Sequence, residues 1–330
     1  MRLFIGYPSA LYFWLRGSQG LWPVEPCATR ALSQAAFNES DVQSFSFPHD
    51  AFGPEPLHLM VDSPSKRRLT PHQKCLVWSY PLARNSFVPI GHNVFVASPA
   101  LCFLQAAKAL PFFDLVELGY EICGSYSRTP GIGKGYFQRS YQLATRQSID
   151  AYIQSVHQAQ RKETALRALR YVLDNSASPP ETDMAVKLFL PQKYGGYNFP
   201  LGELNPEIVL TDEAAAIAHR SKAYPDIFWR GQRACLEYDS AVHHEGSRER
   251  TRDSLKRNAL GCMGYKVITV TPLQLKNVIE FHGVATELAK YLGKRIKPDS
   301  ERTRQARFEL NAAINERMDK DLTPTEWPYV

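Results

Sequence analysis

Short apolar runs between Cys75 and Val96 are separated by proline and asparagine residues. This pattern predicts an antiparallel meander of short strands. Ser98 and Pro99 then supply a helix N-cap and a first-turn proline, and a second helix is predicted over 114–120. The hydrophobic pattern therefore predicts a small α+β module in the N-terminal part of the chain.

Apolar residues recur at helical spacing over 149–156 and 166–173, which predicts two connecting helices. A third helix is predicted from Ser178 to about Leu190. Ser178 and Glu181 have the spacing of a capping box. Glu181 also falls on the apolar face of that helix, where a carboxylate needs a partner. Capping and a role in a site both remain open for Glu181.

The stretch from Asp226 to Asp239 predicts a β-hairpin with its turn at 230–233. Pairing that is symmetric about this turn places Asp226 opposite Glu237, with Cβ atoms roughly 5 Å apart on one face. Asp239 lies two residues beyond Glu237 and shares its face. Like charges this close are destabilising unless a proton or a cation lies between them. Mg²⁺ or Mn²⁺ would relieve the repulsion, because both ions prefer carboxylate oxygens. The alternative is an acidic sheet edge that faces solvent.

A helix over 248–262, a β-branched strand over 265–271 and a helix over 275–292 follow the hairpin. They predict an α/β unit with a central sheet. The predicted domains are an N-terminal α+β module (1–145), a helical connector (146–175), an α/β domain (176–296) and a C-terminal helix with a tail (297–330).

The composition, 44% hydrophobic and 22% charged, is that of an ordinary globular protein. No run of about 18 uninterrupted apolar residues is present, so no membrane span is expected. Met1 to Leu15 is predicted to form a strand and a helix rather than a signal peptide, because Gly6 and Pro8 interrupt it. The six cysteines form no Cys-x-x-Cys pair, a usage typical of a reducing compartment without a zinc site or disulfide framework. We therefore expect a cytoplasmic protein.

The formal charge of +6 lies mostly after Arg220, where Lys and Arg outnumber Asp and Glu. Arg248, Arg252 and Lys256 are spaced by four residues and so share one face of the predicted helix. Basic residues around an acidic centre suit a polyanionic substrate held over metal ions. A solvated pair of basic helices explains the same pattern, and charge alone does not separate the two.

His243 and His244 follow the hairpin in a predicted loop. Adjacent residues cannot point the same way on a strand, so a two-histidine metal clamp is not expected. One histidine near the carboxylates could act as a general acid or hold a phosphate. Two exposed loop histidines are the alternative.

The glycine-rich stretch 128–136 contains Lys134 directly after a glycine. It lacks the G-x-x-x-x-G-K-S/T spacing of a phosphate-binding loop. We therefore predict an exposed loop there.

Six motifs occur in a fixed order: Ser178-Pro-Pro-Glu181, Pro225-Asp226, Glu237-Tyr-Asp239, His243-His244, Arg252-Asp253 with Arg257, and Gly264-Tyr265-Lys-Val-Ile268. In order and spacing they resemble the PD-(D/E)XK nuclease superfamily, specifically its Vsr-like (very-short-patch-repair-like) branch. The resemblance covers about 178–292.

This resemblance implies a restriction-endonuclease-like mixed sheet flanked by helices, preceded here by the small α+β domain. It also implies metal-dependent hydrolysis of DNA phosphodiester bonds, in bacterial defence or DNA repair. Glu181, Asp226 and Glu237 would hold Mg²⁺ or Mn²⁺. Further catalytic candidates are Asp239, His243 and His244, and the expected DNA contacts are Arg248, Arg252, Lys256 and Arg257. The superfamily often has a lysine at the position of Asp239, where it would stabilise the attacking hydroxide. Vsr-like relatives commonly have glycine where this chain has Ser240.

Residues 63–126 are loosely similar to abortive-infection antitoxin proteins. The alternative function is therefore a nucleic-acid-binding, antitoxin-like transcriptional regulator that uses a nuclease fold as a scaffold. The retained acids favour the enzyme, because anionic side chains weaken binding to phosphates. DNA is the expected partner in either case, and a regulatory protein or a homodimer is a further candidate.

Overall fold

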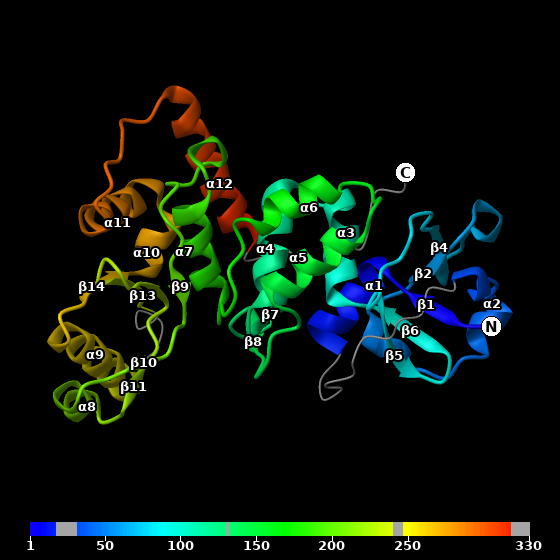
Figure 1. Cartoon of the computed structure of the whole chain (residues 1–330), viewed down its shortest axis with the longest axis horizontal. Coiled ribbons are helices and arrows are strands. Elements are labelled where there is room, and N and C mark those ends of the chain that lie inside the picture. Colours follow the sequence, from blue (N-terminus) through cyan, green and yellow to red (C-terminus); the bar gives the residue numbers. More distant parts are fainter. Residues whose placement is uncertain (18–31, 130–131, 240–246, 318–330) are drawn as a thin grey trace. The chain divides into compact units, whose positions relative to one another are not determined.

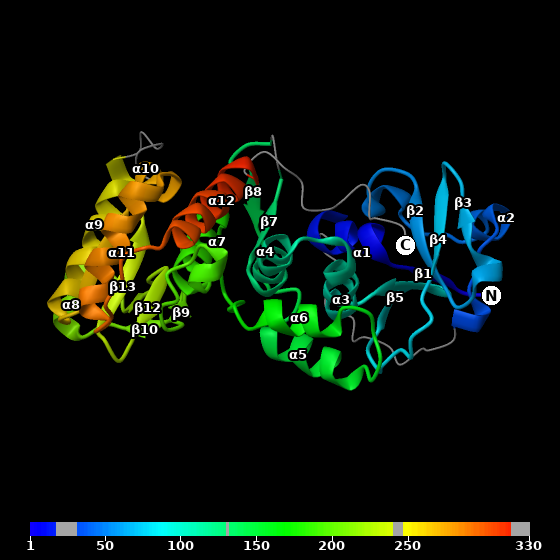
Figure 2. The ribbon, with the colours of Figure 1, turned by 90° about the horizontal axis from the view of Figure 1, so that it is seen from above.

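The computed structural model describes residues 1–17, 32–129, 132–239 and 247–317, with the backbone alone for 247–250 and 317. The chain is a mixed α/β protein that divides into two compact units (Figure 1, Figure 2). The first unit comprises Met1–Cys123 and Arg139–Val172. The second comprises Gly124–Gln138 and the chain from Leu173 to the end of its last helix. These bounds differ from the predicted ones, because segments distant in sequence belong to the same unit.

A six-stranded mixed sheet lies at the centre of the first unit, in the order β3-β4-β2-β1-β6-β5. Its strands are β1 (Leu3–Ile5), β2 (Leu57–Val61), β3 (Arg68–Leu69), β4 (Gln73–Val77), β5 (Phe87–Gly91) and β6 (Val94–Ala97). β5 and β6 form a predicted antiparallel pair. β4 is separated from them by β2 and β1, so the predicted continuous meander is wrong. The reason is β1, whose three apolar residues are fully buried and take the central place in the sheet.

The helices of the first unit are α1 (Tyr7–Tyr12), α2 (Glu39–Gln43), α3 (Pro99–Ala109), α4 (Phe112–Cys123), α5 (Arg146–Ser155) and α6 (Lys162–Leu169). The start of α3 confirms the predicted cap, because Ser98 Oγ accepts a hydrogen bond from the N–H of Leu101. α5 and α6, predicted as a connector, pack against α3 and α4. They therefore belong to the core of the first unit.

The second unit has three groups of strands, six α-helices and one short 3-10 helix (Gln192–Tyr194) among the described residues. The strands are β7 (Tyr126–Arg128), β8 (Tyr136–Gln138), β9 (Glu203–Leu204), β10 (Ile208–Val209), β11 (Lys222–Ala223), β12 (Ile227–Trp229), β13 (Ala234–Tyr238) and β14 (Lys266–Val270). The helices are α7 (Pro179–Phe189), α8 (Asp212–Ala218), α9 (Ser247–Cys262), α10 (Pro272–Lys276), α11 (Val278–Tyr291) and α12 (Glu301–Arg317). The central sheet has the order β14-β13-β12-β9.

β12 and β13 form the predicted hairpin, with Ile227 opposite Leu236 and Trp229 opposite Ala234. This register confirms the one predicted from the symmetric turn, and its continuation by one residue sets Asp226 opposite Glu237. β13 then pairs in parallel with β14, and α9 makes the crossover between them.

Helices cover both faces of this sheet: α8 and α9 lie on one side and α7, α10 and α11 on the other (Figure 1). Phe228 and Cys235 face the first side and share a core with Ala259 of α9. Trp229 faces the second side, where its ring lies 6.1 Å from that of Phe189 in α7. Since directly paired residues share a face, Asp226 and Glu237 point toward the side of α9.

The predicted helix over 275–292 is in fact two helices, α10 and α11, that meet at Asn277. Asn277 has an extended backbone, and its side chain accepts hydrogen bonds from the N–H groups of Ile279 and Glu280. An asparagine in this position caps a new helix, which ends the preceding one.

The predicted exposed loop over 128–136 is in part a hairpin. β7 pairs with β8, with Tyr126 opposite Gln138 and Arg128 opposite Tyr136. The turn residues Gly133 and Lys134 are exposed, as expected for the loop. No helix in the described ranges is long and apolar enough to cross a membrane.

Candidate active site

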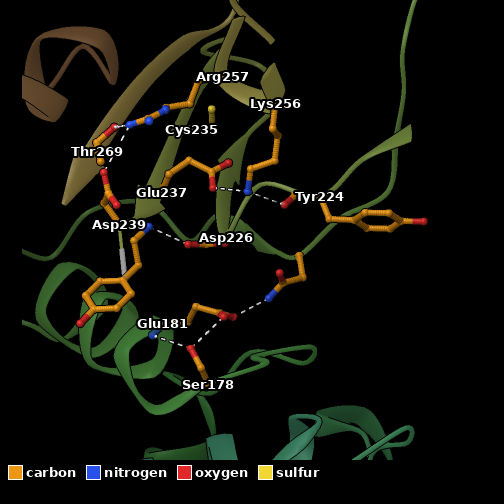
Figure 3. A network of polar contacts seen from close by, with 12 residues as sticks. Ser178, Glu181, Tyr224, Asp226, Cys235, Glu237, Asp239, Lys256, Arg257 and Thr269 are labelled. Atoms are coloured by element: carbon orange, nitrogen blue, oxygen red, sulfur yellow. Dashed lines mark hydrogen bonds and ion pairs between the residues drawn. The ribbon is translucent and has the colours of Figure 1, made fainter. Parts of the chain in front are cut away.

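A pocket of about 190 Å³ opens where the start of α7, the end of the β12–β13 hairpin and the middle of α9 meet. Figure 3 shows most of the polar side chains around it. The lining residues are Tyr136, Gln138, Ser178, Pro180, Glu181, Asp226, Glu237, Tyr238, Asp239, Asp253, Lys256, Arg257 and Thr269. Each predicted acid of the hairpin and of α7 is therefore at this one place.

Asp226 lies directly before β12 and is partly buried. Its Oδ2 accepts a hydrogen bond of 2.6 Å from the N–H of Tyr238, on the neighbouring strand. Burial raises the pKa of Asp226, with a contribution from Asp253, while Lys256 and the Tyr238 N–H act against the shift. The strand pairing thus holds the Asp226 carboxylate against the end of β13.

Glu237, on β13, is the most enclosed acid of the hairpin, with 5% of its surface exposed. Lys256 of α9 donates a hydrogen bond to Glu237 Oε2. The buried Oε1 has no hydrogen-bond partner among the described residues. Burial raises the pKa of Glu237 to about 8, and the charge of Asp226 adds to the shift while Lys256 opposes it. The local field therefore favours an added positive charge at this carboxylate.

Glu181 combines the two roles that its sequence position left open. Its Oε1 accepts from Ser178 Oγ at 2.8 Å, and its Oε2 accepts from the N–H of Ala177 at 2.8 Å and from Asn205 Nδ2 at 2.6 Å. Ser178 Oγ accepts in turn from the N–H of Glu181, so the residue helps to cap α7. The predicted capping box differs in detail, since the carboxylate takes the N–H of Ala177 rather than that of Ser178.

The same carboxylate is electrostatically part of the pocket. Burial raises the pKa of Glu181 to about 7, and Asp226 adds to this shift against the three hydrogen bonds. Glu181 and Asp226 therefore repel each other across the pocket, although one is on a helix and the other on a strand.

Asp239 and Asp253 complete the acidic lining. Asp239 lies 3.5 Å from Arg257 NH1, which also donates to Thr269 Oγ1 at 3.3 Å (Figure 3). Asp239 and Arg257 are more open to solvent than Glu237 and Lys256. Asp253 projects from α9 and raises the pKa of both Asp226 and Glu237.

Lys256 lies inside the pocket rather than on an outer basic face. Its Nζ donates to Glu237 Oε2 and, at 3.3 Å, to the carbonyl oxygen of Tyr224. Burial alone would lower the pKa of Lys256, but the charges of Glu237 and Asp226 outweigh burial and raise it. Lys256 is therefore a buried cation of the site, paired with Glu237.

Of the other predicted DNA contacts, Arg257 also lines the pocket. Arg252 is exposed on α9, and Arg257 is turned toward Asp239. Arg248 is in α9, but its side chain is outside the described ones. His243 and His244 fall outside the described residues altogether.

Tyr136 and Gln138 are among the lining residues that were missed in the sequence, as are Tyr238 and Thr269. The available signal was the pair of short runs Tyr126-Ser-Arg128 and Tyr136-Phe-Gln138 on either side of a glycine-rich turn, which is a hairpin pattern. Nothing local to 126–138 indicates that this hairpin reaches a pocket built from residues after Ser178.

Whether the site fits a divalent cation is a question of donor chemistry and geometry. Within the described part of the chain, no three His, Cys, Asp or Glu side chains are grouped as a metal site requires. The donor type does fit, since carboxylate oxygens suit Mg²⁺ and Mn²⁺. Glu237 Oε1 is also buried and has no hydrogen-bond partner in the part of the chain that the structure describes. Asp226 and Glu237 would have to draw together around the ion, and Lys256 would have to release Glu237 Oε2 or share it.

No protein-family model, curated protein or solved structure matches this chain. The function of the chain is therefore inferred from the residues of the pocket.

Proposed function

We propose that the second unit is a Mg²⁺- or Mn²⁺-dependent endonuclease that hydrolyses DNA phosphodiester bonds. We assign it to the PD-(D/E)XK superfamily, near the Vsr-like branch, with a restriction-endonuclease-like fold. The observation that carries the proposal is the meeting of Glu181, Asp226 and Glu237, from three separate elements, at one pocket. The motif order supports the same conclusion, because it sets an acid on a helix, an acid before a strand and Glu-x-Asp on the next strand.

Charge is the second support. The pocket is lined by five carboxylates, Glu181, Asp226, Glu237, Asp239 and Asp253, and by the cations Lys256 and Arg257. A phosphodiester would be repelled from such a site unless additional positive charge were bound there. A pure DNA-binding scaffold gains nothing from buried acids that raise one another's pKa. An enzyme gains a site for catalytic cations.

Asp226 and Glu237 are the side chains that would hold the metal, with Glu181 close by. A bound divalent ion supplies a hydroxide at neutral pH and charge stabilisation at the phosphate. Lys256 would stay protonated beside Glu237, since its pKa is raised, and would face the negative charge that develops at the attacked phosphorus. In the superfamily, a lysine at the position of Asp239 commonly provides this charge stabilisation. Arg257 would keep Asp239 neutralised through their ion pair.

The test is a cleavage assay on single-stranded, duplex and mismatched DNA with Mg²⁺, Mn²⁺ or chelator. We expect metal-dependent cleavage by the full chain, and a loss of at least about 100-fold in Asp226→Asn, as for the removal of a group that stabilises the transition state. Glu203→Gln is the matched control. Glu203 is an exposed acid on β9 that pairs with Arg230 and does not line the pocket.

The competing function, a regulator that uses this fold as a scaffold, predicts a different result. DNA binding would then occur without divalent cations. Neither wild type nor Asp226→Asn would cleave DNA. Full cleavage by Asp226→Asn would overturn the proposed mechanism.

A further inference from the structure

The hairpin of β7 and β8 forms one wall of the pocket. Tyr126 lies opposite Gln138 and Arg128 opposite Tyr136, so these four side chains share one face of the hairpin. Tyr136 and Gln138 both line the pocket, next to Glu181 and the hairpin acids. A segment far upstream of α7 in sequence therefore completes the site.

Buried contacts fix this hairpin to α7, the helix that carries Glu181. Tyr126 Oη lies 2.9 Å from Thr182 Oγ1, and both side chains are fully buried. Arg128 NH2 lies 3.8 Å from Asp183 Oδ1, also in the interior. Contacts to Thr182 and Asp183, the two residues that follow Glu181 in α7, set the position of β8 relative to the pocket.

Tyr136 and Gln138 have hydrogen-bonding groups to offer. Among the described residues, neither the Tyr136 hydroxyl nor the Gln138 amide makes a hydrogen bond within the protein. Burial raises the pKa of Tyr136, and the charges of Glu181 and Asp226 add to the shift. The phenol therefore keeps its proton, and both side chains are neutral donors at an acidic pocket.

A phosphate group in this pocket would need neutral hydrogen-bond donors. Bound cations would neutralise the acids, and the non-bridging phosphate oxygens would still require hydrogen bonds. We infer that Tyr136 and Gln138 bind the scissile phosphate of the substrate, the phenol O–H and the amide N–H each donating to a non-bridging oxygen. This inference rests on the proposed function and assigns its substrate-positioning residues.

The experiment compares full-chain Tyr136→Phe and Gln138→Ala with wild type in metal-dependent DNA cleavage. A hydrogen bond to a charged group accounts for roughly 10- to 100-fold, so each variant should lose about that factor in kcat/KM. Phe137→Leu is the control, because Phe137 is on the same strand and its side chain points to the other face of the hairpin. It should cleave like wild type.

A second substrate separates positioning from a merely structural role. After the wild-type cleavage position is mapped, the phosphate there is replaced by a methylphosphonate, which lacks one non-bridging oxygen. In the stereoisomer that lacks the oxygen bound by Tyr136, the penalty of Tyr136→Phe should fall below about 3-fold, because wild type can no longer make that hydrogen bond.

Wild-type rates in both Tyr136→Phe and Gln138→Ala, with Asp226→Asn inactive, would overturn the inference and leave the proposed function standing. A Tyr136→Phe penalty that is equally large on both stereoisomers of the methylphosphonate would also overturn it. Cleavage that survives in Asp226→Asn would instead overturn the proposed function, and the inference with it.

Discussion

The residue that decides the chemistry of the pocket is Glu237. It is a buried carboxylate between Asp226 and Lys256, with one oxygen held by the lysine and the other without a partner among the described residues. A carboxylate is buried in this way only when a proton or a cation compensates for lost hydration. Burial and the charge of Asp226 raise the pKa of Glu237, so a proton compensates for the lost hydration in the metal-free protein.

Stability should therefore depend on pH in the metal-free protein. Glu237 and Glu181 have pKa values raised from 4.5 to about 8 and about 7. Their stabilisation is full below about pH 4.5 and is lost as the pH rises through the folded-state values. We expect the free energy of unfolding to fall by several kcal/mol, at most about 7 kcal/mol, between about pH 5 and pH 8.5. Urea unfolding at both pH values measures this change.

Glu237→Gln provides the comparison, since glutamine does not titrate. Its free energy of unfolding should fall less over the same range than that of wild type. Addition of Mg²⁺ should likewise flatten the wild-type dependence. A wild-type stability that is constant or rises with pH would show that these acids are not held in the protonated form.

At the scale of elements, the start of α7 contributes both to helix capping and to the pocket. Ser178 caps the helix and at the same time donates to Glu181, so one hydroxyl supports both a helix end and a pocket acid. Thr211 caps α8 in the same way, by accepting from the N–H of Ala214, but it does not line the pocket.

This pair of caps allows stability and activity to be separated. Ser178→Ala and Thr211→Ala should each lower the free energy of unfolding by about 1 kcal/mol, as is usual for the loss of an N-cap. Ser178→Ala alone should also lower the cleavage rate, by roughly 10-fold, because Glu181 loses a positioning partner. Chemical denaturation and the cleavage assay give the two quantities. Equal effects of both variants on cleavage would mean that helix stability, and not the position of Glu181, sets the rate.

The sequence was sufficient for elements whose determinants are local. The register of the β12–β13 hairpin follows from its turn and its alternation, and Ser98 and Ser178 were recognisable as caps. The break at Asn277 was missed, because an apolar helical pattern continues on both sides of it and conceals the cap. The place of Lys256 could not be read from spacing, since the helix face it shares with Arg252 looks uniformly basic until β13 is set against it.

At the scale of the whole molecule, the chain interleaves its two units. Gly124–Gln138 belongs to the second unit, although it lies between α4 and α5 of the first. Division by sequence order therefore assigned it to the N-terminal module and set α5 and α6 apart as a connector. A hydrophobic pattern tells which face of an element is buried, but the partner that covers it is decided by long-range packing. The β7–β8 wall of the pocket depends on this packing.

The central claim is that the acids of this pocket gather to hold a divalent cation. Titration calorimetry with Mn²⁺ at about pH 7.5 tests it directly on full-chain wild type, Asp226→Asn, Glu237→Gln and the control Glu203→Gln. We expect Mn²⁺ to bind to wild type and to Glu203→Gln, with affinity at least about 10-fold weaker in the two pocket variants. No binding to wild type at millimolar Mn²⁺, or equal binding to all four proteins, would contradict the claim.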